Sequence, residues 1–188
     1  MKFTQKIIKS FLPKESTRQA LKMIGFEKKT GIFTATDGHK IIQWKDDETA
    51  ELLPKDCCIP LDCFPENDKS TSRISLVEFE GKEMFKVESS TNEVAYYNYT
   101  EEYYPNVEAI MGCGKKRSID QITLNFSLIK HFETLQKQYP RTKLIFSGEH
   151  NPVFVVPDQD CVSFDSDDNI IFSDTWDWRG AFMPMRQS

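Results

Sequence analysis

The chain has 188 residues and a formal net charge of −5, from 24 lysines and arginines against 29 aspartates and glutamates. This length suits one or two domains with a real core, and a content of 39% hydrophobic and 28% charged residues is ordinary for a soluble globular protein. The acidic balance argues against a tight, sequence-specific grip on duplex DNA, because modules of that kind are usually basic. A protein that surrounds DNA loosely needs only a locally positive inner face, so the net charge does not exclude it.

No stretch of the sequence approaches the roughly 18 apolar residues of a membrane helix, and no secretory signal follows Met1. We therefore expect a cytoplasmic protein without membrane contact. The cysteines are odd in number and irregularly spaced, which is typical of reduced thiols: Cys57, Cys58, Cys63, Cys113 and Cys161. They lack the paired spacing of a zinc site, so we expect no metal.

The first third of the chain predicts a short helix, an extended segment and a hairpin. Thr4 can cap a helix that Pro13 ends, with apolar positions Ile7, Ile8, Phe11 and Leu12. Residues 18–28 suit a strand, although 19–23 could also be helical by propensity. Asp37-Gly38 lies between two runs of strand formers, residues 31–35 and 41–44, and predicts a tight hairpin turn.

The middle third predicts mainly strands. Residues 57–60 form a short strand that leads into a poor helix over 61–71, which Pro65 breaks. Residues 74–80, 83–89 and 94–100 predict a three-stranded meander. The tyrosines between 96 and 104 are more typical of sheet packing than of a base-stacking platform. Residues 112–117 are a candidate linker with three consecutive positive charges.

The last third predicts a strand at 119–126, followed by the clearest helix of the chain. Ser127 is its expected cap, and its core stripe at helical spacing is Leu128, Ile129, Phe132 and Leu135. Further strands are expected at 143–147, 153–156 and 182–186. The segment 158–178 contains seven aspartates and no lysine or arginine. Its start at Asp165 is like a calcium loop but lacks the required glycine and glutamate, and its tryptophans indicate a loop that docks on the body.

Two segments far apart in the sequence are Thr-Ala-Thr-Asp-Gly-His-Lys at 34–40 and Met-Pro-Met-Arg at 183–186. They resemble the ATDGHRL-like turn and the C-terminal MPMR-like strand of the bacterial sliding clamp family, the β subunit of the replicative DNA polymerase. Shorter likenesses lie at 16–21, 104–106, 125–128 and 151–153. The resemblance implies an α+β DNA-clamp fold built from repeats of a helix and antiparallel strands.

This chain contains about three such repeats, starting near residues 1, 57 and 119, instead of the family's six. The resemblance implies a clamp domain at 1–112, similar to the family's middle domain. Residues 113–188 would be a half domain, similar to the C-terminal part of the last clamp domain, with the acidic insertion at 158–178. The third repeat would then have an unpaired sheet edge, which either the insertion or another copy of the chain would cover.

The resemblance also implies a groove for short extended peptides that carry a glutamine and hydrophobic residues. Its expected residues are Leu21, Thr36, Gly38, His39, Lys40, Ile41, Asn125, Leu128, Val153, Met183, Pro184, Met185 and Arg186. Methionines suit a surface that accepts several sequences, although Met183 and Met185 could simply fill the core. Lys40 stands where the family has arginine, and Gly112 where a pocket proline would be expected.

The second implied role is salt-sensitive contact with DNA phosphates. The candidates, which could equally be solvated surface charges, are Lys6, Lys9, Lys115, Lys116, Arg117, Lys130 and Lys137. No catalytic motif or cofactor-binding pattern is present, so we expect a non-enzyme without cofactors. Two hypotheses follow. The chain is a compact, oligomeric sliding clamp and DNA polymerase processivity factor, or it is an adaptor or competitor that binds peptides of polymerase or repair proteins without encircling DNA.

Overall fold

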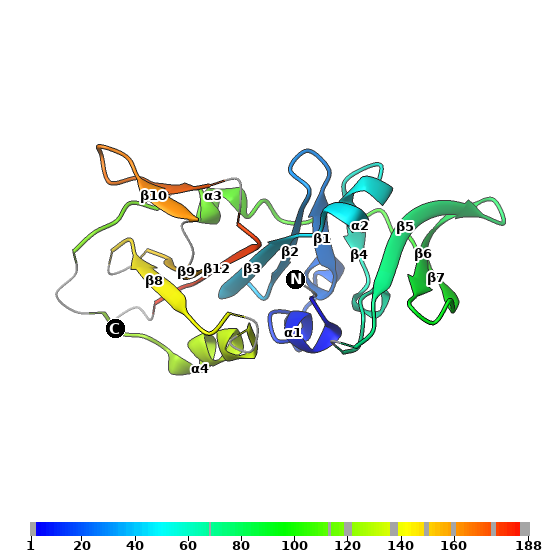
Figure 1. The fold of residues 1–188 in the computed structure, drawn as a ribbon, viewed down its shortest axis with the longest axis horizontal. Helices are drawn as coiled ribbons and strands as arrows, with labels where there is room; N and C mark the ends of the chain where they lie inside the picture. The colour runs from blue at the N-terminus through cyan, green and yellow to red at the C-terminus, as the bar shows by residue number, and fades with distance from the viewer. Residues whose placement is uncertain are drawn as a thin grey trace. The chain divides into compact units, whose positions relative to one another are not determined.

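The computed structural model describes residues 3–67, 69–112, 114–118, 122–135, 139–148, 151–158, 161–173 and 176–184. Short helices alternate with antiparallel strands (Figure 1), which confirms the expected α+β class. The chain divides into two compact units, residues 1–37 with 45–105 and residues 38–44 with 106–188. The sequence-based boundary at 112 thus lies a few residues beyond the division at 105. No helix in the described ranges is long and apolar enough to cross a membrane.

The first unit begins with short helices around a small sheet. Its elements are α1 (Gln5–Lys9), η1 (Gln19–Lys22), β1 (Ile24–Glu27), β2 (Ile32–Thr36), α2 (Asp47–Leu52), β4 (Cys57–Ile59) and η2 (Leu61–Cys63), where η denotes a 3₁₀ helix. Strand β1 pairs with β2 and with β4. Helix α2 forms because the Asp46 side chain accepts a hydrogen bond from the Thr49 amide at 3.2 Å. The helix expected at 61–71 is only the single turn η2, since Pro65 prevents its continuation.

The predicted meander follows as β5 (Ser72–Phe79), β6 (Lys82–Ser89) and β7 (Val94–Asn98), so this prediction is confirmed. Its turns need left-handed backbone conformations: φ is 52° at Glu80, 76° at Gly81 and 62° at Asn92. Phe85 is fully buried on one face of the sheet, while Phe79 stacks on Tyr96 with a centroid distance of 4.3 Å and both remain partly exposed.

The second unit contains four antiparallel strands that neighbour one another in the order β3-β12-β9-β8, together with a separate β10–β11 hairpin. Its elements are β3 (Lys40–Lys45), α3 (Glu108–Met111), α4 (Phe126–Ile129), η3 (Lys130–Leu135), β8 (Thr142–Phe146), β9 (Val153–Pro157), β10 (Val162–Phe164), β11 (Ile170–Phe172) and β12 (Trp178–Phe182). Figure 1 shows β12, in red, beside β3 and β9. The acidic insertion is folded rather than a plain loop, because it contains the β10–β11 hairpin and ends in β12.

Two strand predictions in the second unit are wrong. Residues 122–125 form no strand, and Phe126 opens α4 because the Asn125 side chain, not Ser127, caps it by accepting the Ser127 amide at 3.0 Å; residues 119–121 lie outside the described ranges. The final strand ends at Phe182 rather than running through 182–186. Pro184 has no N–H to donate to a ladder, whereas the small residues Gly180 and Ala181 fit into the crowded centre of the sheet.

Candidate functional site

Strands β3 and β12 bring together segments that are far apart in the sequence. Their ladder pairs Ile41 with Ala181 and Gln43 with Arg179. Beyond the ladder, the Met183 amide donates a hydrogen bond of 3.0 Å to the His39 carbonyl. The Gly38-His39 part of the turn and the residue that follows β12 are therefore direct neighbours in the second unit.

A small hollow, partly open to solvent, lies beside this contact. Its lining residues all belong to the second unit: Gly38, His39, Ile41, Ile110, Pro152, Ala181, Phe182 and Met183. Most of them are apolar. Gly38 is exposed and adopts a φ of +90°, a conformation that glycine reaches without strain. The hollow is far too small to enclose a whole small molecule. It therefore suits only the tip of an apolar side chain of a longer ligand.

The lining includes only part of the set that the sequence suggested. Gly38, His39, Ile41 and Met183 belong to it. The following do not: Lys40 and Val153, both buried opposite Phe182; Asn125 and Leu128, at the start of α4; and Pro184, buried beyond β12. Leu21 in η1 and Thr36 in β2 belong to the first unit. Met185 and Arg186 lie outside the described residues.

Four lining residues were not among the predicted ones: Ile110, Pro152, Ala181 and Phe182. Pro152 and Phe182 are the sequence neighbours of Val153 and Met183, which were predicted. At these two places the sequence motif therefore missed a lining residue by one position. Ala181 follows from its register opposite Ile41, which only the paired strands reveal. No sequence motif pointed to Ile110. It lies on α3, two residues before Gly112, the position where the resemblance led us to expect a proline.

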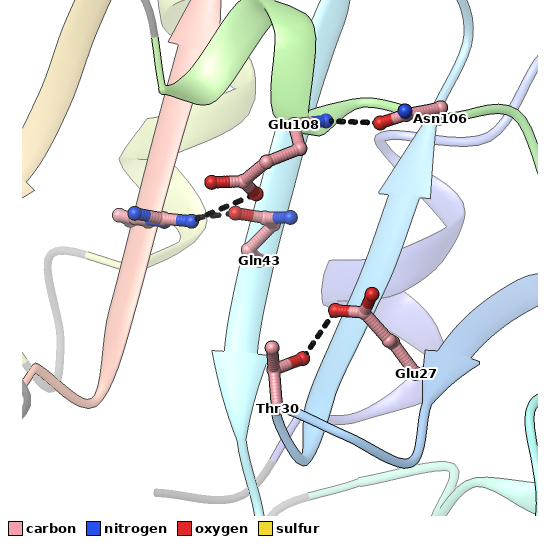
Figure 2. A network of polar contacts seen from close by, with 6 residues as sticks. Glu27, Thr30, Gln43, Asn106 and Glu108 are labelled. Carbon is pink, nitrogen blue, oxygen red and sulfur yellow. Dashed lines mark hydrogen bonds and ion pairs between the residues drawn. The ribbon is translucent and has the colours of Figure 1, made fainter.

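A buried arginine lies on the same sheet. Arg179 has only 6% of its surface exposed, and its Nε donates a hydrogen bond of 2.8 Å to Gln43 Oε1. Its Nη2 lies 3.6 Å from a carboxylate oxygen of Glu108 on α3 (Figure 2). The guanidinium carbon also lies 4.6 Å from the ring centroid of Phe172 and 4.7 Å from that of Trp176. Burial lowers the pKa of Arg179, and the Glu108 charge opposes this shift.

The candidate DNA contacts fall into three places. Lys6 and Lys9 are exposed on α1, whose other side buries Ile7 and Ile8. Lys130 is exposed at the start of η3, and Lys137 lies outside the described ranges. Residues 115–117 are exposed as well, but this strip runs beside the acidic β10–β11 turn.

The contacts of this strip are backbone and aromatic. The Lys116 amide donates to the Asp168 carbonyl at 2.8 Å, and its ammonium lies 4.8 Å from the centroid of Phe164. The backbone of Lys115 forms a β-bridge with Asn169. Hydrogen bonds from the Asn169 side chain and backbone hold the pKa of Asp165 below its usual range, and the nearby Lys115 charge adds to this shift. The basic strip therefore has an acidic neighbour.

The thiols of the first unit are buried and unpaired with one another. Burial raises the pKa of Cys57 to about 12 and that of Cys58 to about 11, and it raises the pKa of Cys63 further. These thiols are therefore protonated at neutral pH. Among the described residues, no group of three or more histidine, cysteine, aspartate or glutamate side chains could hold a metal ion.

The arrangement of helices and antiparallel sheets is that of the DNA-clamp fold. The structure is similar to the β subunit of the DNA polymerase of Streptococcus pyogenes, with a TM-score of 0.62 and 13% identity over 97% of this chain and 63% of that one. It is also similar to the DNA polymerase III β subunit of Pseudomonas aeruginosa, with a TM-score of 0.59, 12% identity and the same coverage. For a putative DNA polymerase III β subunit from Eubacterium rectale the TM-score is 0.56, at 11% identity and coverage of 97% and 64%.

These likenesses establish the fold, and with it the resemblance that the sequence motifs indicated. No protein-family model matches the chain, and no curated protein matches it. The chain spans less than two thirds of the length of the similar clamp structures, which agrees with a shortened clamp architecture.

Proposed function

We propose that this protein binds short extended peptides of partner proteins, with an apolar side chain of the peptide packed against the hollow beside β3 and β12. The hollow itself is the observation that supports this proposal, because it is lined mostly by apolar residues and is partly open to solvent next to the tight turn at Gly38. The flexible side chain of Met183 at the hollow can adapt to different peptides. By analogy with the clamp fold, polymerase or repair proteins are the proposed partners.

A direct test measures the binding of a fluorescent synthetic peptide in which a glutamine is followed by leucine and phenylalanine. We expect saturable binding and an affinity about five- to tenfold weaker for Met183→Ala, because truncating a central apolar contact usually costs more than about 1 kcal/mol. Met84→Ala is the matched control, since Met84 is also half-buried but lies on β6 of the first unit. Equal losses in the two variants, or no binding by the unchanged protein, would rule out the proposal.

Such a protein can act as a processivity factor only if several copies form a ring and this ring encircles DNA. A ring of several copies, with Lys6, Lys9 and Lys130 among the residues facing DNA, is the first candidate arrangement. The second is an adaptor or competitor that does not encircle DNA. The acidic β10–β11 turn beside residues 115–117 would repel DNA phosphates, which favours this second candidate. Solution mass separates the two: a stable monomer excludes the ring, and salt-sensitive retention on circular but not linear DNA excludes the adaptor.

A further inference from the structure

The hollow depends on α3, because Ile110 forms one of its walls. This helix has only four residues, which is too short to be stable by itself, so its position must come from tertiary contacts. Met111 supplies one contact, since it is fully buried. The ion pair from Glu108 to Arg179 supplies another.

Arg179 lies on the same face of the sheet as Ile41 and Ala181, which line the hollow. Side chains two residues apart on a strand share a face, so Arg179 lies on the face of Ala181, and Gln43 lies on the face of Ile41. The ladder places Arg179 opposite Gln43 and Ala181 opposite Ile41, as two successive rungs on one face. The other face is occupied near Gly180 by Phe132, which an added Cβ would meet at 2.4 Å. Arg179 and α3 thus meet on the side of the sheet where the hollow opens.

We propose that Arg179 is the positioning residue of the hollow: its guanidinium holds α3, and with it Ile110, against the sheet face formed by Ile41 and Ala181. The guanidinium is rigid and planar, so its Nε and Nη2 can engage Gln43 and Glu108 together. Glu108 and Gln43, which Figure 2 shows side by side, both contact this guanidinium. Only the consequence for peptide affinity rests on the proposed function.

The acidic insertion takes part in this support. Phe172 at the end of β11 and Trp176 before β12 both contact the Arg179 guanidinium, and Trp176 is 5% exposed. A buried cation is costly unless charges, hydrogen bonds or ring faces replace its hydration. The two aromatic rings therefore make the buried position of Arg179 possible, so Phe172 and Trp176 support the residue that holds α3.

The test compares Glu108→Gln and Arg179→Lys with Glu133→Gln. This control removes one negative charge, as Glu108→Gln does, but on an exposed side chain of η3. The two primary readouts need no ligand. The first is the NMR chemical shift of the Ile110 δ-methyl group. The second is the hydrogen-exchange rate of the Gly112 amide, which donates a hydrogen bond of 2.7 Å to the Glu108 carbonyl. We expect both test variants to move the methyl signal and to speed this exchange about tenfold, because α3 opens locally. The control should change neither.

Peptide affinity is the second readout, with the synthetic peptide described above. We expect the affinity to fall about fivefold in both test variants, because the energetics of residues in contact are coupled and a displaced α3 would move Ile110 away from the peptide. Glu108 is mostly exposed, so its variant carries the test even if Arg179→Lys does not fold. Methyl and exchange values equal to those of the control would overturn the inference, whatever the affinity. If the unchanged protein binds no peptide, the proposed function fails while the methyl and exchange data still decide the role of Arg179.

Discussion

Gly180 lies at the most crowded position of β12, and its replacement by alanine tests the packing of the central strand. An added Cβ would lie 2.4 Å from Phe132 Cε1 and 2.8 Å from the backbone oxygen of Ile41. Both distances are well below the roughly 3.5 Å of a favourable contact. The Ile41 oxygen belongs to the neighbouring strand, so it cannot rotate away as a side chain could.

Overpacking of this kind usually costs about 1–3 kcal/mol. Because Gly180→Ala meets both a ring and a strand backbone, we expect a loss near the upper end, about 2–3 kcal/mol in the free energy of unfolding. For a chain of this size, each kcal/mol lowers Tm by about 2–4 °C, so Tm should fall by about 4–12 °C.

Urea unfolding followed by tryptophan fluorescence measures this loss, since Trp44 and Trp178 are both fully buried. The same change made in a Phe132→Leu background should cost about 1 kcal/mol less, because the smaller side chain leaves room for the new methyl group. An unchanged urea midpoint for Gly180→Ala would refute the overpacking argument. An equal cost in both backgrounds would refute the part assigned to the Phe132 ring.

Three further predictions concern exposure and titration. Phe126 is 78% exposed whereas Phe85 is fully buried, so thermal unfolding should show a change within about 0.5 kcal/mol for Phe126→Ser and a loss of about 3–5 kcal/mol for Phe85→Ala; similar losses would contradict the burial of Phe85. Iodoacetamide at pH 8 should modify Cys57, Cys58 and Cys63 at least about 100-fold more slowly in the folded protein than in urea, because their raised pKa values keep the thiols protonated; rapid labelling without denaturant would refute this. The unfolded chain loses these protons near pH 8.5 whereas folded Cys58 keeps its proton to about pH 11, so stability should fall as the pH rises from about 9 to 11. Urea midpoints measured across this range should fall less in Cys58→Ala, and an identical fall would show that other groups cause it.

Strand patterns and turn chemistry were sufficient to predict much of the fold. The meander follows from alternating segments of 74–80, 83–89 and 94–100, together with turn residues that tolerate positive φ. The last third was harder, because tertiary contacts decide its elements. Asn125 captures the Ser127 amide and starts a helix where β-branched residues favour a strand. Similarly, Gly180 reads as a strand breaker, yet it is needed where Phe132 approaches the sheet.

The candidate site could be predicted only in part for the same reason. The turn at Gly38 and His39 and the segment at Met183 carry local patterns, so sequence alone pointed to them. Ile110 lines the hollow because Arg179 and Glu108 hold α3 in place, and a single ion pair between distant residues leaves no local pattern. Strand register therefore decides which residues of a predicted site meet. A slip of one residue would move every side chain of the strand to the opposite face of the sheet.

The pairing of β3 with β12 also determines when the hollow can form during synthesis. Gln43 and Arg179, which hydrogen-bond across this ladder, are 136 residues apart. Closing so long a loop is slow, and folding that depends on non-local pairs lags behind folding that depends on local ones. The first unit can collect most of its contacts while the chain is still being made. The hollow, in contrast, cannot form until Ala181, Phe182 and Met183 have left the ribosome. A prematurely terminated chain would therefore fold its first unit and lack the hollow on which the proposed peptide binding rests.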